Sequence, residues 1–135
     1  MTSENDLFGE PIYSYTRAQA LADGVLFDVS KMAKQAGFKI PMAVTDTVWH
    51  SFIEWSHDDS QKQTHQDTDG RLWDVLSMLR FAIAKASDTS CIFYKLHVVP
   101  RDGKAKKAEL IQLKAVISAG DNGEPAITIM LPNED

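Results

Sequence analysis

Residues 70–99 read GRLWDVLSMLRFAIAKASDTSCIFYKLHVV, and this stretch decides the fold class. As far as Ile83 its apolar residues recur every three or four positions, which is the spacing of an α-helix. Beyond Asp88 the pattern changes to alternation, with Ile92 and Tyr94 on one side of an extended chain. A helical segment followed by a strand-like segment predicts an α+β protein.

Two further alternating segments follow, at residues 111–117 and 127–131. The connections PRDG at 100–103 and GDNG at 120–123 are rich in residues that tolerate turn geometry. Short turns favour antiparallel pairing between consecutive strands. We therefore predict a C-terminal three-stranded antiparallel meander, with the helices packed on one face of the sheet.

Toward the N-terminus the sequence predicts about four helices, two of them short. Thr16 and Gln19 have the capping-box spacing of a short helix that ends near Gly24. A second short helix is expected at residues 29–36, and an amphipathic helix at residues 45–55.

The fourth helix begins after Gly70 and is apolar around much of its circumference. We expect it to be the central helix, contacted on more than one side. Trp49 and Trp73 fall on apolar helix faces and are expected in the core. Residues 56–69 have no apolar side chain and no period, so they predict a long loop that closes at Asp69-Gly70.

Length and composition indicate one domain, spanning residues 1–135, with a flexible start at residues 1–11. The single cysteine, Cys91, lies in an apolar run and indicates a reducing compartment. The N-terminus lacks the basic and then apolar pattern of a secretory signal, and no stretch has the length of a membrane span. We therefore expect a cytoplasmic protein without a membrane partner.

Charge is unevenly distributed in this chain, whose net charge is -5. Residues 42–70 carry six acidic residues against one lysine, and Asp58 and Asp59 among them are candidate contacts for a partner protein. Residues 101–107 are basic and form a candidate phosphate contact, although a solvated turn is the simpler interpretation. The basic residues concerned are Arg101, Lys104, Lys106 and Lys107.

No motif identifies a catalytic, metal or cofactor site. His50 and His57 lie near acidic residues, but seven helical positions separate their backbones by about 10 Å, which is too far for one ion. Phosphate-binding, dinucleotide-binding and serine-nucleophile motifs are missing, and nothing around Cys91 marks an activated thiol. We predict no metal and no cofactor. An enzyme would need a site assembled from scattered polar residues such as Tyr13, Arg17, Asp28, His50 and Asp74.

Tyr13 and Tyr15, beside the first helix cap, are further candidate binding residues, because aromatic side chains dominate interaction hot spots. Arg17 completes this group. The same region carries a resemblance, together with residues farther along the chain. The stretches concerned are YSYTRAQA at 13–20, DGVLFDV at 23–29, AGF at 36–38, Pro41, Val44-Thr45, Val48-Trp49 and GRLWDVL at 70–76.

These stretches resemble a family of small bacterial and phage proteins that is classified as a domain of unknown function. Its members occur often on plasmids and other mobile elements, so the resemblance implies an accessory role in the biology of such elements. It implies no activity and no catalytic residue.

Three hypotheses of function follow. The first is a non-enzymatic interaction protein that binds another protein, or a second copy of itself, through its acidic loop and the edge of its sheet. The alternatives are a nucleic-acid-associated protein that uses residues 101–107, and an enzyme with an unrecognised site.

Overall fold

The structure is a computed structural model that describes residues 15–86 and 90–135. The predicted flexible start at residues 1–11 and the candidate residue Tyr13 lie outside the described residues. The helices are α1 (Arg17–Ala22), α2 (Ser30–Gln35), α3 (Asp46–Val48) continued by the π-helical turn η1 (Trp49–Ile53), α4 (His57–Lys62) and α5 (Thr68–Lys85). The strands are β1 (Leu26–Asp28), β2 (Met42–Thr45), β3 (Cys91–Val98), β4 (Glu109–Ala119) and β5 (Pro125–Met130).

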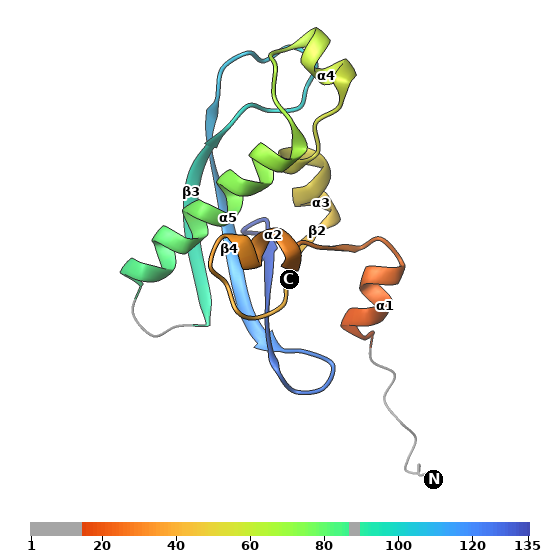
Figure 1. The fold of residues 1–135 in the computed structure, drawn as a ribbon, viewed down its shortest axis with the longest axis vertical. Helices are drawn as coiled ribbons and strands as arrows, with labels where there is room; N and C mark the ends of the chain where they lie inside the picture. The colour runs from red at the N-terminus through yellow and green to blue at the C-terminus, as the bar shows by residue number, and fades with distance from the viewer. Residues whose placement is uncertain (1–14, 87–89) are drawn as a thin grey trace.

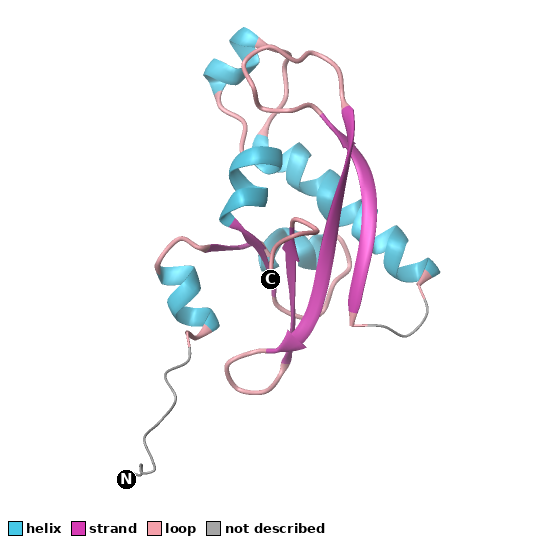
Figure 2. Cartoon of the chain, turned by 180° about the vertical axis from the view of Figure 1, so that it is seen from behind, coloured by secondary structure: helices cyan, strands magenta, loops and turns pink. Residues whose placement is uncertain are grey.

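The α+β class is confirmed, but the three-stranded meander is a wrong prediction. The sheet has five strands in the order β1-β2-β5-β4-β3, and it is mixed. The predicted antiparallel pairs β3–β4 and β4–β5 are present. They are extended by a parallel pair, β2–β5, and by an antiparallel pair, β1–β2. Figures 1 and 2, seen from opposite sides, show α5 crossing one face of this sheet, with its C-terminal end projecting past β3.

The two additional strands carry no alternating pattern. All four residues of β2 are buried, because the strand lies between two others with both faces covered. Such a strand is a short apolar run, which periodicity does not separate from loop or helix. β1 has only three residues. Neither strand therefore had a sequence signal of its own.

The helix predictions are confirmed in part. The capping box of Thr16 and Gln19 is present at α1, and Thr45 caps α3. The helix predicted at residues 45–55 ends earlier, at Ile53, through the π-helical turn. α5 begins at Thr68, because Asp67 accepts a hydrogen bond from the backbone N–H of Gly70 and caps the helix earlier than expected.

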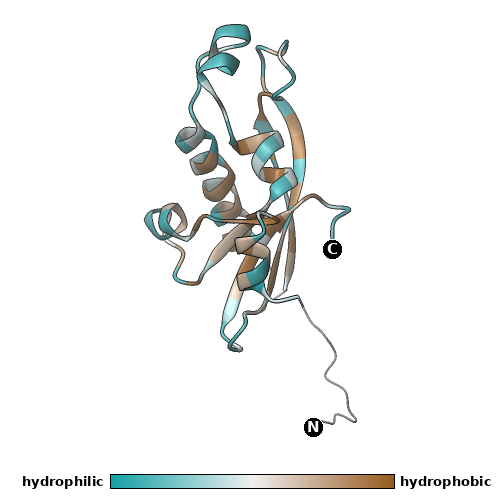
Figure 3. Cartoon of the chain, turned by 90° about the vertical axis from the view of Figure 1, so that its right-hand side faces the viewer, coloured by the Kyte–Doolittle hydropathy of each residue, from teal (hydrophilic) through white to brown (hydrophobic). Residues whose placement is uncertain are grey.

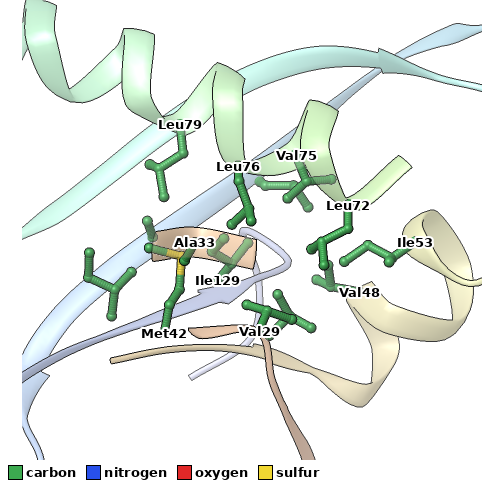
Figure 4. Packing of buried hydrophobic residues seen from close by; sticks show 14 of the residues in the cluster. Val29, Ala33, Met42, Val48, Ile53, Leu72, Val75, Leu76, Leu79 and Ile129 are labelled. Atoms are coloured by element: carbon green, nitrogen blue, oxygen red, sulfur yellow. The ribbon is translucent and has the colours of Figure 1, made fainter. Parts of the chain in front are cut away.

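The core lies between the sheet and the inner faces of α2, α3 and α5. Figure 4 shows side chains from these elements pointing toward one another, with Leu76 and Leu79 of α5 above Met42 and Ile129 of the sheet. Figure 3 shows the same division by hydropathy, with apolar colours along the strands and polar colours on α4. Within the described ranges, no helix is long and apolar enough to cross a membrane.

Candidate functional site

The predicted acidic loop and basic loop lie against each other. Residues 56–69 are not one loop, because they contain α4, which a capping box between Ser56 and Asp59 starts. Arg101 donates to Asp59 through Nε at 2.6 Å and to Glu54 through Nη1 at 2.8 Å. We call this contact, made by Glu54, Asp59 and Gln63 with residues 100–105, the polar clamp.

Electrostatics in the polar clamp favour the charged forms of its carboxyl groups. The hydrogen bond from His50 lowers the pKa of Glu54, and Arg101 lowers it further. Burial raises the pKa of Asp59, but hydrogen bonds from Ser56 and Arg101 outweigh it and the net shift is downward. Much of the acidic charge predicted to meet a partner is therefore neutralised within the chain.

Gln63 anchors the loop that carries the basic residues. Its side chain is 7% exposed, and its amide donates to the carbonyls of Pro100 at 2.8 Å and Ala105 at 2.6 Å. Its oxygen accepts from the backbone N–H of Gly103 at 3.0 Å. The loop thus wraps around one neutral side chain. No sequence pattern identified Gln63, although the Ser56-x-x-Asp59 spacing would have placed it just after a helix.

The other candidate residues are dispersed. Asp58 pairs with Lys62 on the exposed side of α4 at 3.1 Å. Lys104, Lys106 and Lys107 are exposed on the loop. Tyr15 is 49% exposed, and its hydroxyl donates to Asp23 at 2.5 Å.

Arg17 is used within the fold. Its guanidinium donates to the hydroxyl of Thr128 at 2.7 Å and to the carbonyl of Ile127 at 2.8 Å. Asp121 accepts from the first backbone N–H groups of α1. These contacts fasten α1 to the sheet.

The scattered residues of the enzyme hypothesis do not share a cavity in the described structure. Arg17 and Asp28 line one cavity, Asp74 lines others, and His50 is exposed on η1. Residues 15–86 and 90–135 hold no group of three or more histidine, cysteine or acidic side chains that could bind a metal.

The outer face of α5 differs from the sequence prediction, because it leaves large apolar side chains exposed. Leu72, Val75, Leu76 and Leu79 are buried on the inner face. Trp73, predicted in the core, is 43% exposed, and Phe81 is 62% exposed. At 100° per residue, Phe81 lies opposite the buried stripe and Trp73 lies on the flank of the helix, about 110° from the centre of the stripe. The described chain therefore leaves part of the apolar circumference of this helix exposed.

β3 is an outer strand of the sheet, and its register shows which backbone groups face outward. The N–H of Ile117 donates to the carbonyl of Ser90, so the residues at even positions from 90 to 98 direct their backbone groups to β4. Those at odd positions, among them Phe93, Lys95 and His97, direct theirs to the open side.

A groove of about 530 Å³ runs between this edge and α5. We call it the edge groove; its lining residues include Met78, Phe81, Lys95, His97 and Leu110. Phe81 and Leu110 are more than half exposed. The groove therefore combines apolar side chains with the edge of a strand that has no neighbour on that side within the described sheet.

A smaller cavity of about 180 Å³, the arginine cavity, adjoins the edge groove and shares Asp74 and His97 with it. Its walls also include Gln66 and Arg71. Arg71 is 5% exposed, and burial lowers its pKa to about 10.

Comparison with known proteins gives one match. The model of a family described as a family of unknown function matches residues 5–135, nearly the whole chain. No curated protein and no solved structure matches.

Proposed function

The chain belongs to this family, DUF6573, and we propose that it is a non-enzymatic interaction protein that binds an extended segment of another protein in the edge groove. The observation that carries the proposal is the uncovered apolar face of α5 beside an open strand edge. A helix that is apolar around most of its circumference is covered on more than one side when its partners are present. We place this role in the cytoplasm, as an accessory function of a plasmid or phage.

An extended segment fits the groove by strand addition. The outward backbone groups of β3 supply main-chain hydrogen bonds, while pockets beside the strand select side chains. Met78 and Phe81 on α5 and Leu110 on β4 line the groove and suit apolar side chains. Lys95 at the centre of the edge discourages indiscriminate pairing, which is a common use of lysine on edge strands.

A second copy of the chain fits less well. Figure 1 shows the C-terminal end of α5 projecting past β3. In two copies joined edge to edge, each β3 would have to accommodate the projecting α5 of the other copy as well as its own. An extended segment meets only one α5.

The test is selection of binding peptides from a displayed random library, followed by affinity measurement on variants. Phe81→Ser should weaken the selected peptides at least about tenfold, the usual size of a hot-spot loss. Val25→Ser is the matched control, since Val25 is 43% exposed and does not line the groove, and it should change affinity less than about twofold.

Hydrogen exchange locates the bound segment. Binding should slow exchange at the outward amides of Phe93, Lys95 and His97, because strand addition occupies them. Equal affinity in Phe81→Ser and Val25→Ser, or unchanged exchange along β3, would contradict the proposal. Light scattering gives the molar mass in solution. If this mass is twice that of one chain, and Phe81→Ser reduces it to that of one chain, the occupant of the edge groove is a second copy and not a peptide.

A further inference from the structure

Arg71 in the first turn of α5 is a buried cation whose contacts are all neutral. Its Nε donates to the carbonyl of Ile53 at 3.0 Å, and Nη1 donates to Gln66 Oε1 at 2.7 Å and the carbonyl of Val99 at 3.0 Å. The guanidinium lies 4.4 Å from the ring centroid of Trp55. Nη2 is buried and has no hydrogen-bond partner in the described part of the chain.

Burying the charge of Arg71 costs free energy, and a residue that only joined α5 to the neighbouring segments would not need that charge. A buried charge is unfavourable unless an opposite charge and hydrogen bonds compensate it. Asp59 and Asp74 attract Arg71 only through space, and Arg101 opposes them. Gln63 ties the same loop with a neutral amide. Joining α5 to the loop therefore does not by itself require a cation.

The arginine cavity presents hydrogen-bond donors. Gln66 and Val99, which accept from Nη1, both line it, so the guanidinium forms part of its wall. Arginine can only donate, so the contact fixes the Gln66 oxygen toward Arg71 and leaves the amide N–H groups of Gln66 for the cavity. His97 adds a ring nitrogen, and Phe52 and Val98 add apolar walls.

We propose that the arginine cavity binds a small carboxylate, held by Arg71, Gln66 and His97. Nε and Nη1 already donate to Ile53, Gln66 and Val99, so Nη2 is the guanidinium nitrogen left to donate a charge-assisted hydrogen bond to a carboxylate. The volume admits only a few heavy atoms beyond the carboxyl group. Asp74 lies exposed on the rim, and its negative charge disfavours a doubly charged anion such as phosphate.

Such a carboxylate has two sources: a free small acid, or the C-terminal end of a peptide in the edge groove, which shares Asp74 and His97 with the cavity. The second source rests on the proposed function, whereas the first does not.

The experiment is a nuclear magnetic resonance titration of the isotope-labelled full chain. Sodium acetate should produce a saturable shift of the Arg71 Nε–H and Gln66 side-chain signals, and sodium chloride at equal ionic strength should not. Asp74 and His97 both line the cavity and are both exposed, so variants at these positions test the site without disturbing the core. Asp74→Asn should tighten acetate about threefold, the effect of a like charge some 6 Å away in water. His97→Ala should weaken it about fivefold, the worth of one hydrogen bond.

A titration with peptides distinguishes a free small acid from the C-terminal end of a bound peptide. An N-acetylated apolar tetrapeptide with a free carboxylate should shift the Arg71 signal, and the same peptide with a C-terminal amide should not. Tighter binding of the peptide than of acetate assigns the cavity to a peptide end; weaker binding assigns it to a free acid. Equal responses to acetate and chloride, or no change in affinity in Asp74→Asn, would overturn the inference. Failure of the edge groove appears separately, as peptide affinity that is indifferent to Phe81→Ser.

Discussion

The polar clamp and the edge groove lie toward opposite ends of α5. The clamp pairs charged side chains within the chain, whereas the groove leaves apolar side chains exposed. In the clamp, Arg101, Asp59 and Glu54 are charged residues that form ion pairs within the chain. In the groove, Phe81 and Leu110 are large apolar residues that lie more than half exposed.

The difference shows why residue type alone misleads about function. Charged residues in a polar stretch are taken for a binding surface, yet several of them here hold α4 to a loop. Apolar residues in a helix are taken for core, yet here Trp73 and Phe81 are exposed on α5. The variants below test this contrast, beginning with the largest expected effect.

Leu79 and Phe81 are two positions apart on α5 and separate core from groove. Leu79 is fully buried and Phe81 is 62% exposed. Leu79→Ala should lower the free energy of unfolding by about 3 kcal/mol, since it leaves a cavity. Phe81→Ala should change it by less than about 0.5 kcal/mol. Urea denaturation measures both, and equal losses would mean that Phe81 is packed within the folded chain.

Gln63 tests whether the clamp holds the basic loop. Gln63→Ala should cost about 2 kcal/mol, because it leaves the backbone groups of Pro100, Gly103 and Ala105 without their partner. Gln61→Ala, in the last turn of α4 just before Gln63 but exposed, should cost less than about 0.5 kcal/mol. Urea denaturation compares the two, and similar values would show that the loop does not depend on Gln63.

The ion pair between Arg101 and Asp59 should give a coupling of about 1 kcal/mol at pH 7 in a double-mutant cycle with alanine. The pKa of Asp59 is lowered in the folded state, so its contribution is present above the unfolded value of about 4 and is lost as the pH falls through the folded value. The pKa of Glu54 is also lowered in the folded state, so its contribution to stability is likewise lost as the pH falls. A coupling that persists undiminished at pH 2 would contradict this account.

The smallest effect on stability is expected from Lys104, Lys106 and Lys107 changed together to alanine. These side chains are exposed, so the free energy of unfolding should change by less than about 0.5 kcal/mol. The affinity for peptides in the edge groove should be unaffected. Fluorescence anisotropy with a labelled DNA duplex checks the nucleic-acid alternative. Salt-dependent binding that the triple variant removes would restore that alternative.

Local signals predicted local structure well. The capping residues Thr16 and Thr45 start α1 and α3, and alternation placed β3, β4 and β5. Ser56 and Asp59 have the same kind of spacing, so α4 was readable within a stretch that looked like a loop.

What escaped prediction depends on contacts far apart in the chain. β2 is recognisable only by its neighbours, and Gln63 matters only because residues 100–105 fold around it. Trp73 has the pattern of a core residue, and only the arrangement of the described elements around α5 shows that it is 43% exposed. For the same reason the edge groove and the arginine cavity have no motif, since each joins α5 to β3.

The parallel pairing of β2 with β5 also bears on the order in which the protein is made. β2 lies in the first half of the chain, and its partner is the last strand. During synthesis the buried residues of β2 must therefore wait until residues 125–130 have been made, so the sheet closes only after the β3–β4 hairpin is complete. A nascent chain halted before residue 125 lacks β5, the strand that joins β2 to β4, so its sheet remains in two separate parts.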